Sequence, residues 1–163
     1  MRVQPFHCRP CRSRRARGQT LVEMMIVVMI LMVLVAVAIG GYQNYKDRVR
    51  VTQAITDIQA MSVTIKHYLV DNQSLPDSLA DVGLASKLDP WGHPYFYLDL
   101  TSQNGKGKSR RDRKLNPLNS DFDLYSAGKD GLTQTQLTAH NSRDDIIRAS
   151  DGRFVGLASD FDP

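Results

Sequence analysis

Three aspartates in the last third of the chain, Asp130, Asp144 and Asp145, have the residue type and spacing to bind a hard cation. Calcium takes about six to eight oxygen ligands from carboxylates and carbonyls in flexible geometry. A plainer interpretation fits the same residues, because Lys129-Asp130-Gly131 has the composition of an ordinary turn. The adjacent pair could likewise cap a helix or lie in solvent. Taken alone, the pattern favours this plainer interpretation over a metal site.

Glu23 is a second candidate because it is the only charged residue in an otherwise apolar run, residues 21 to 39. As a helix, this run would span roughly 28 Å at about 1.5 Å per residue, close to the ~30 Å hydrocarbon core of a bilayer. The run therefore predicts a membrane-spanning helix. A charge inside such a helix costs about 2.5 to 3.5 kcal/mol on insertion scales. This cost marks Glu23 as a functional residue that needs a counter-charge.

The chain's formal net charge of +4 arises from its leader, residues 1 to 18. The leader has no acid and six of the 21 basic residues, so residues 19 to 163 carry a net charge of −2. Its basic residues are Arg2, Arg9, Arg12, Arg14, Arg15 and Arg17. By the positive-inside rule they hold the N-terminus in the cytoplasm, so the C-terminal part crosses the membrane. A secretory signal peptide is the competing interpretation, but its cleavage site would follow a shorter apolar stretch, whereas Gly18 precedes this one.

Both cysteines, Cys8 and Cys11, lie in the leader next to His7. Their CxxC spacing supplies only half of a zinc site. Residues 19 to 163 contain no cysteine, so no disulfide stabilises them. Outside the helix this part is small enough that a hydrophobic core alone gives marginal stability, and a bound metal would be a useful addition.

The elements that must position these residues begin with a second helical segment after the apolar run. Apolar residues recur there at three-and-four spacing, which predicts an amphipathic helix: Ala54, Ile55, Ile58, Met61, Ile65, Tyr68 and Leu69. Gly40-Gly41 lies between the two segments, and each glycine costs a helix about 1 kcal/mol relative to alanine. The pair predicts either a weak point where the helix unwinds or bends, or a plain break between two helices.

Three short segments after the helix have the composition of β-strands. They are Tyr95-Phe96-Tyr97-Leu98, residues 122 to 126, and residues 154 to 157. The first two predict a hairpin whose loop, residues 102 to 116, is rich in Gly, Lys and Arg and almost free of apolar residues. We expect that loop to be solvated. Nucleic acid is not an expected partner, because single-stranded binding needs aromatic residues among the basic ones and this loop has none.

The junction Arg17-Gly18-Gln19-Thr20-Leu21-Val22-Glu23, directly before the apolar run, resembles the prepilin processing site shared by type IV pilins and type II secretion pseudopilins. The resemblance implies that a prepilin peptidase cuts after Gly18 and methylates the new amino terminus at Gln19. Members of these families more often begin with Phe. Glu23 would then be the fifth residue of the mature chain, where the families have their glutamate.

Three motifs of the C-terminal part look like the globular domain of the major pseudopilin of type II secretion. They are Asp89-Pro90-Trp91-Gly92, residues 122 to 131, and Asp144-Asp145-Ile146. The resemblance implies calcium as a cofactor, bound by the carboxylates of Asp130, Asp144 and Asp145. It also implies backbone carbonyl ligands, which carry over to Ala127 and Ser142. The intervening loop, residues 132 to 143, and the tail, residues 149 to 163, are longer than the family pattern.

The implied fold is α+β and type IV pilin-like, with a long N-terminal helix packed on a small antiparallel sheet that carries a calcium-binding loop. The expected parts are a leader, residues 1 to 18, that is removed; a transmembrane helix, residues 19 to 41, that forms the filament core; and a periplasmic globular domain, residues 42 to 163. The last part includes the amphipathic half of the helix. We expect a single-pass protein of the bacterial inner membrane.

The implied function is that of a structural subunit, which polymerises in the periplasm into a pseudopilus that drives folded proteins through the outer membrane. Expected partners are other copies of the chain, minor pseudopilins, the prepilin peptidase and the inner-membrane assembly platform. A type IV pilin or a minor pseudopilin is the alternative, although pilins usually carry a C-terminal disulfide. An enzyme is not expected, because no nucleophile motif accompanies His67, His93 or His140.

Overall fold

The computed structural model describes residues 18 to 103, 105 and 107 to 161, without the side chains of residues 40 and 41. The leader cysteines, His7 and the leader arginines lie outside these residues. Contacts divide the chain into two units, Met1–Tyr42 and Gln43–Pro163.

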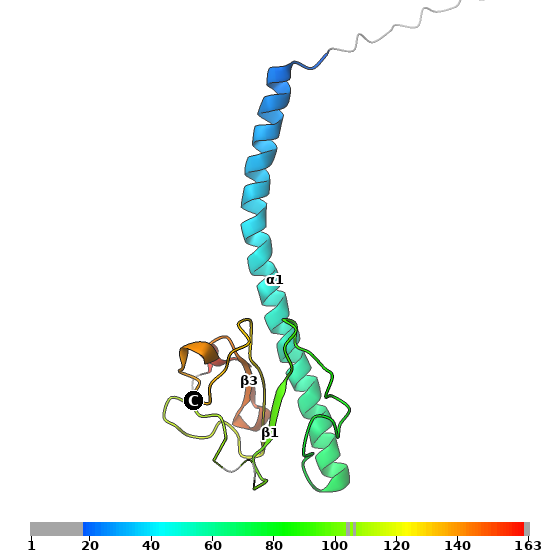
Figure 1. Cartoon of the computed structure of the whole chain (residues 1–163), viewed down its shortest axis with the longest axis vertical. Helices are drawn as coiled ribbons and strands as arrows, with labels where there is room; N and C mark the ends of the chain where they lie inside the picture. The colour runs from blue at the N-terminus through cyan, green and yellow to red at the C-terminus, as the bar shows by residue number, and fades with distance from the viewer. Residues whose placement is uncertain (1–17, 104, 106, 162–163) are drawn as a thin grey trace, which may run out of the picture. The chain divides into compact units, whose positions relative to one another are not determined.

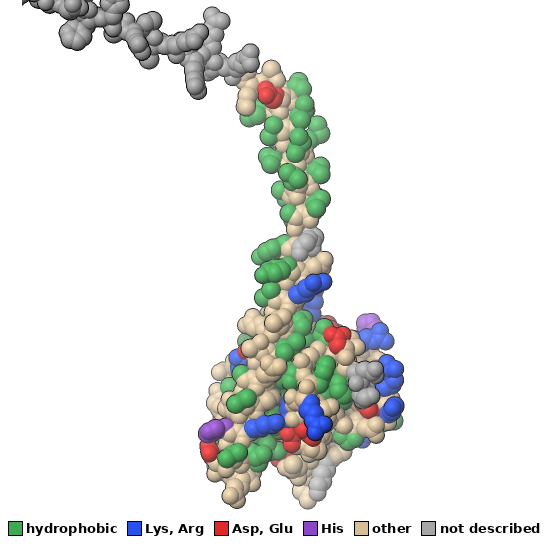
Figure 2. Space-filling model, turned by 180° about the vertical axis from the view of Figure 1, so that it is seen from behind, with side chains coloured by type: hydrophobic (Ala, Val, Ile, Leu, Met, Phe, Trp, Pro, Cys, Tyr) green, Lys and Arg blue, Asp and Glu red, His purple; other side chains and the backbone are tan. Residues whose placement is uncertain are grey.

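The first unit contains the start of the helix α1, Leu21–Asn72 (Figure 1). Every side chain described between residues 18 and 39 is exposed, and hydrophobic side chains cover the visible face of this segment (Figure 2). α1 is long and apolar enough to cross a membrane, and the candidate span lies near the N-terminus. The predicted apolar helix is therefore present. The helical assignment continues through Gly40 and Gly41, so the prediction of a plain break between two helices is wrong. The alternative, a weak point within one continuous helix, stays a prediction.

The second unit is built on the rest of α1, whose apolar face is buried as predicted. Ala54, Ile58 and Ile65 are fully buried and Met61 is 1% exposed. These positions follow the spacing of about 3.6 residues per turn, so they share one face of the helix. They pack with Phe122, Leu124 and Ile146 of the sheet in one hydrophobic cluster. Burying each of the larger side chains stabilises the unit by roughly 1.5 to 3 kcal/mol.

In the described part of the chain the sheet has four antiparallel strands in chain order, with bounds β1 Phe96–Asp99, β2 Phe122–Ser126, β3 Ile146–Ala149 and β4 Phe154–Leu157. β1 and β2 form the predicted hairpin, in which Phe96 lies opposite Tyr125 and Asp99 opposite Phe122. The second and fourth strands have the predicted bounds, and β1 begins one residue later than predicted. The antiparallel sheet and the long helix confirm the expected α+β fold.

β3 is the strand that sequence pattern did not predict. All four of its residues are buried, including the Arg148 side chain, and it pairs with both β2 and β4. A central strand covered on both faces does not alternate between apolar and polar residues. At four residues, with an arginine inside, it also lacks the length and composition that mark a buried strand.

The face of the sheet opposite α1 is covered by the connections, which corrects part of the prediction of a solvated hairpin loop. Residues 107, 108 and 113 to 116 are exposed as predicted, whereas other loop residues are buried. Leu118, Leu137, Ile147, Ala149 and Ala158 form a second hydrophobic cluster on this side. Within the loop, Ser109, Arg110 and Asp112 are buried at 9%, 4% and 5% exposure. The guanidinium of Arg110 lies 4.1 Å from the ring centroid of Tyr125. The basic composition of the loop alone did not reveal that the Arg110 side chain packs on the sheet.

Candidate functional site: the processing junction and the aspartate loop

The processing junction lies at the start of α1. Gly18, Gln19 and Thr20 have no regular secondary structure and are exposed, and the helix begins at Leu21. The hydroxyl of Thr20 accepts a hydrogen bond from the backbone N–H of Glu23 at 3.3 Å, which is the usual contact of an N-cap residue. The Gly18–Gln19 peptide bond therefore precedes the helix in an accessible segment, as a cleavage site requires.

Glu23 is exposed and lies in the first turn of α1. The partial positive charge of a helix N-terminus favours a carboxylate at this position. Thr20 and Glu23 also have the spacing of a capping box, which is a local sequence signal for the helix start. The unit itself therefore holds Glu23 close to the amino terminus that cleavage after Gly18 would create.

The aspartate loop, which we define as residues 127 to 145, is folded around the carboxylate of Asp144. Its Oδ2 accepts the backbone N–H groups of Lys129 at 2.9 Å and Asp130 at 3.2 Å. Gly128 has a φ of +65°, and a Cβ there would lie 2.3 Å from the Asp144 carbonyl oxygen, so the turn needs glycine. The Asp130 carboxylate bonds within its own turn, because its Oδ1 accepts the N–H of Leu132 at 2.8 Å.

Asp145 is more deeply buried than Asp144, and its carboxylate faces the side chain of Arg110. Its Oδ2 accepts hydrogen bonds from Arg110 Nη2 at 2.5 Å and from the Thr133 hydroxyl at 2.7 Å. Both charged side chains are almost inaccessible, at 5% exposure for Arg110 and 0% for Asp145. Burial raises the pKa of the Asp145 carboxyl, and the neighbouring Arg110 acts in the opposite direction. Sequence reasoning missed Arg110, because nothing in the loop marks which of its many basic residues is buried.

The loop also holds the two residues expected to offer carbonyl oxygens. Ala127 and Ser142 are both fully buried. Ser142 ends the short 3₁₀ helix η1, His140–Ser142, and its hydroxyl accepts the N–H of Gln134 at 2.8 Å and donates to the carbonyl of Gln134 at 3.0 Å. These contacts fold residues 134 to 142 into a compact turn.

The Asp89-Pro90-Trp91-Gly92 motif holds the start of the aspartate loop in place. Asp89, 5% exposed, accepts the N–H groups of Trp91 and His93 through Oδ1, and the hydroxyl of Ser126 through Oδ2 at 2.6 Å. Ser126 in turn accepts the N–H of Gly128 at 3.1 Å. The His93 ring Nδ1 lies 3.2 Å from the carbonyl oxygen of Gly128. The motif is therefore a structural support for the loop.

The three aspartates do not converge on one point in this structure. Among residues 18 to 103, 105 and 107 to 161, no three His, Cys, Asp or Glu side chains form a group that could hold a metal ion. One oxygen does suit a hard cation, because Asp145 Oδ1 is buried and has no hydrogen-bond partner among those residues. A buried carboxylate oxygen without a partner is costly, and calcium prefers such donors. The donor chemistry fits calcium, while Arg110 already occupies the other oxygen of the same carboxylate.

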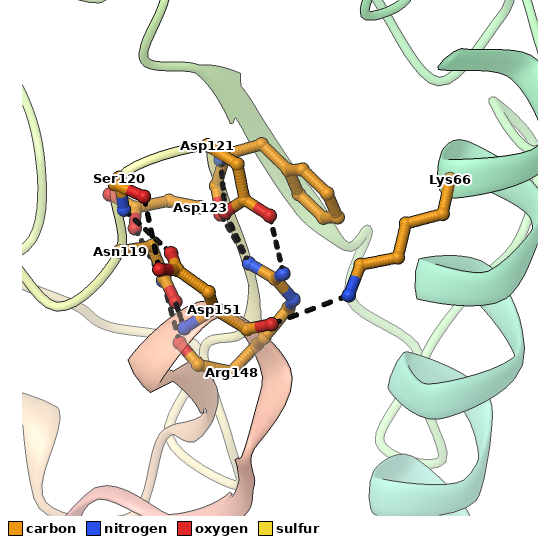
Figure 3. A network of polar contacts seen from close by, with 8 residues as sticks. Lys66, Asn119, Ser120, Asp121, Asp123, Arg148 and Asp151 are labelled. Atoms are coloured by element: carbon orange, nitrogen blue, oxygen red, sulfur yellow. Dashed lines mark hydrogen bonds and ion pairs between the residues drawn. The ribbon is translucent and has the colours of Figure 1, made fainter. Parts of the chain in front are cut away.

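A second buried arginine, Arg148, is a residue of β3. Arg148 donates to both carboxylate oxygens of Asp121 and to the carbonyl of Phe122 (Figure 3). Asp151 accepts the N–H and hydroxyl of Ser120, and its own carbonyl accepts the ammonium of Lys66 at 3.3 Å. This network joins α1 to the C-terminal segment through polar contacts, and its role is structural.

The chain has a long apolar N-terminal helix, a segment with Gly18 directly before that helix, and an antiparallel sheet packed on the helix's amphipathic part. These features together define a type IV pilin-like protein. Residues 13–39 match the family described as a prokaryotic N-terminal methylation motif. The type II secretion system core protein G of Pseudomonas aeruginosa is 32% identical over 141 residues, which cover 74% of this chain and 88% of that protein. The chain therefore belongs to the family of type II secretion system core protein G, the major pseudopilins.

A second core protein G agrees with this assignment, and a pilin shows a shorter match. The type II secretion system core protein G of Dickeya chrysanthemi is 27% identical over 144 residues, covering 76% of this chain and 84% of that protein. A fimbrial protein of Pseudomonas aeruginosa is 36% identical, but over only 100 residues that cover 58% of this chain and 56% of the fimbrial protein. No solved structure matches this one. The core protein G relatives thus match a larger share of this chain than this pilin does.

Proposed function

We propose that this chain is the repeating subunit of a type II secretion pseudopilus, which grows in the periplasm and moves folded proteins through the outer membrane. The observation that carries the proposal is the extent of the match to core protein G, which covers 88% of that protein and so includes the globular unit as well as the helix. A processing junction alone would fit any pilin-like protein.

The exposed apolar surface of the helix supports a precursor that is anchored in a membrane. Side chains such as Leu21, Met29 and Val37 are 77%, 60% and 76% exposed in the isolated chain. An apolar surface of this extent is stable only in a membrane or against other helices. We place the precursor in the bacterial inner membrane as a single-pass protein. The arginine-rich leader faces the cytoplasm and the globular unit faces the periplasm.

Prepilin peptidase then removes residues 1 to 18 and methylates the amino group of Gln19. The accessible, non-helical segment before Leu21 supports this step. In the filament, the new amino group of Gln19 pairs with Glu23 of a neighbouring copy. Such a pair neutralises a charge that is costly in an apolar core, and it fixes the axial position of each added subunit. The filament is a head-to-tail assembly that extends without closing.

Calcium binding at the aspartate loop is part of the same proposal. Asp130, Asp144 and Asp145 would supply the carboxylates, with Ala127 and Ser142 offering backbone carbonyls. The unpartnered Oδ1 of Asp145 and the compact folding of the loop around Asp144 support it. A bound ion would neutralise the carboxylates and fasten the loop to the sheet.

The partners of the chain are further copies of itself, the minor pseudopilins, the prepilin peptidase and the inner-membrane assembly platform. Its role is structural and not enzymatic. An adhesive or motile type IV pilus subunit is the second candidate, favoured only by the shorter match to fimbrial proteins. A minor pseudopilin would share the same fold.

Overproduction in a strain that contains the secretion machinery tests the assembly step. Electron microscopy with an antibody against the globular unit should show thin filaments when the chain is abundant. The control is Gly18→Ala, which removes the glycine at the cleavage point and should leave the protein uncut in the membrane. If processed wild-type protein forms no filaments under conditions in which another major pseudopilin does, the assembly proposal is wrong.

A further inference from the structure

Arg110 is a buried basic residue beside the aspartate loop that neither the sequence pattern nor the family resemblance predicted. It lies in the hairpin loop between β1 and β2, 35 residues before Asp145 in the sequence. Its backbone N–H donates to Asp123 Oδ2 at 2.7 Å, and its Nη1 donates to the Thr133 hydroxyl at 3.0 Å. The guanidinium is also stacked over Tyr125. Three other contacts therefore hold Arg110 in the position from which its Nη2 reaches Asp145.

The contact between Arg110 and Asp145 is close but incomplete. Arginine and carboxylate groups commonly form two parallel hydrogen bonds, whereas here Nη2 alone reaches Oδ2. Arg110 Nε and Asp145 Oδ1 are both buried and without partners among the described residues. Asp145 is thus neutralised through one oxygen, and its second oxygen remains available inside the domain.

We infer that Arg110 is a built-in counter-cation that competes with calcium for Asp145 and so sets how far the globular unit depends on the metal. This inference rests on the calcium site proposed above. Without the ion, Arg110 keeps the buried carboxylate compensated and the loop folded. With the ion, two cations share one carboxylate in a region that water does not reach, where like charges repel strongly.

The inference predicts how stability and calcium affinity change when Arg110 is replaced. Replacing Arg110 by glutamine removes the positive charge but keeps a side chain of hydrogen-bonding type. The unit should then lose stability without calcium, because Asp145 becomes an uncompensated buried charge. It should also bind calcium more tightly, by about tenfold for one removed neighbouring charge. The calcium-induced rise in melting temperature should therefore be larger in R110Q than in the wild type.

The experiment uses the mature chain in detergent, because its globular unit has not been separated from the helix. Unfolding is followed by the fluorescence of Trp91, the only tryptophan. Each variant is melted in chelator, in millimolar calcium chloride and in millimolar magnesium chloride. Arg148→Gln is the matched control, since Arg148 is an equally buried arginine whose carboxylate partner is Asp121. R148Q should lower the melting temperature by the same amount in chelator and in calcium.

The outcomes separate this inference from the calcium proposal. A larger calcium-induced rise in R110Q than in wild type supports both, provided that wild type also responds. A response in R110Q alone supports the inference and ends the calcium proposal for the natural chain. An equal or smaller response in R110Q overturns the inference while the calcium proposal stands. No response in either protein overturns both.

A second variant covers the case in which R110Q does not fold. Arg110→Lys keeps the charge but loses the planar group that stacks on Tyr125 and contacts Thr133. Its hold on Asp145 is weaker, so its calcium-induced rise in melting temperature should lie above that of wild type. A rise equal to that of wild type would overturn the inference.

Discussion

Arg148 and Asp121 form a two-point ion pair inside the globular unit, with Nη1 2.7 Å from Oδ1 and Nη2 2.6 Å from Oδ2. The arginine side chain is fully buried and the aspartate side chain is 27% exposed. The guanidinium carbon also lies 4.0 Å from the ring centroid of Phe122 in the main core. This pair fixes the start of β2 against β3 and places a full charge next to the hydrophobic cluster.

Arg148→Gln should lower the free energy of unfolding by about 3 to 5 kcal/mol, because Asp121 then loses a buried partner. Chemical denaturation of the mature chain measures this change. Lys129→Ala is the control, since its ion pair with Asp47 is exposed, at 64% and 41% for the two side chains. That variant should stay within about 0.5 kcal/mol of wild type. Equal effects of the two substitutions would show that burial does not decide the strength of these pairs.

Asp151 should make stability depend on pH. Hydrogen bonds from Ser120 lower the pKa of the Asp151 carboxyl in the folded protein. Its stabilising contribution is therefore complete above the unfolded-state pKa of about 4 and is lost as the pH falls through the folded-state value. Asp151→Asn fits the backbone, because asparagine tolerates the positive φ of 57° at this position.

The stability difference between wild type and D151N should be largest at neutral pH and shrink toward zero in strong acid. Denaturation curves at a series of pH values measure it. Ser120→Ala is a partner control, since it removes only the hydroxyl donor and should reduce the same pH dependence in part. A difference that stays constant from pH 7 to pH 2 would contradict the assigned role of these hydrogen bonds.

Glu23→Ala should leave processing and membrane insertion intact but impair filament assembly. Removing the charge eases insertion, while the amino group of a neighbouring Gln19 loses its counter-charge. The measurement compares membrane-bound mature protein with sheared filament yield. Thr20→Ala serves as the control, because it weakens the helix start by about 1 kcal/mol and keeps the carboxylate. Wild-type filament yield from E23A would rule out the counter-ion role.

The mature chain should begin at Gln19, with one methyl group on its amine. Intact mass of protein extracted from membranes tests both points at once. A strain without prepilin peptidase provides the unprocessed reference. A mature N-terminus beyond residue 39 would instead indicate an ordinary signal peptide and would contradict the pilin-like processing pathway.

Sequence pattern predicted the elements whose periodicity is simple. The buried face Ala54, Ile58 and Ile65 follows directly from helical spacing, and β2 and β4 have the predicted bounds. β3 was missed because its burial depends on partners on both sides and not on alternation within four residues. Local pattern carries no information about which distant strands will cover a segment.

The candidate site was predicted only in outline. The aspartates and the supporting Asp89 motif were found from residue types and family resemblance, and the structure shows how Asp144 and Asp89 organise the loop. The partnership of Arg110 with Asp145 could not be predicted, because 34 residues and a strand separate them in the chain. Convergence of the three aspartates on one calcium ion stays a prediction.

Deletion of the gene for this chain, in its own bacterium, tests the central claim most directly. Proteins that leave the cell folded should be measured in the culture medium and in the periplasm. The account predicts that they accumulate in the periplasm, that surface pili are unchanged, and that a wild-type copy restores export while E23A does not. Normal export combined with loss of surface pili would contradict the account and identify the chain as a pilus subunit.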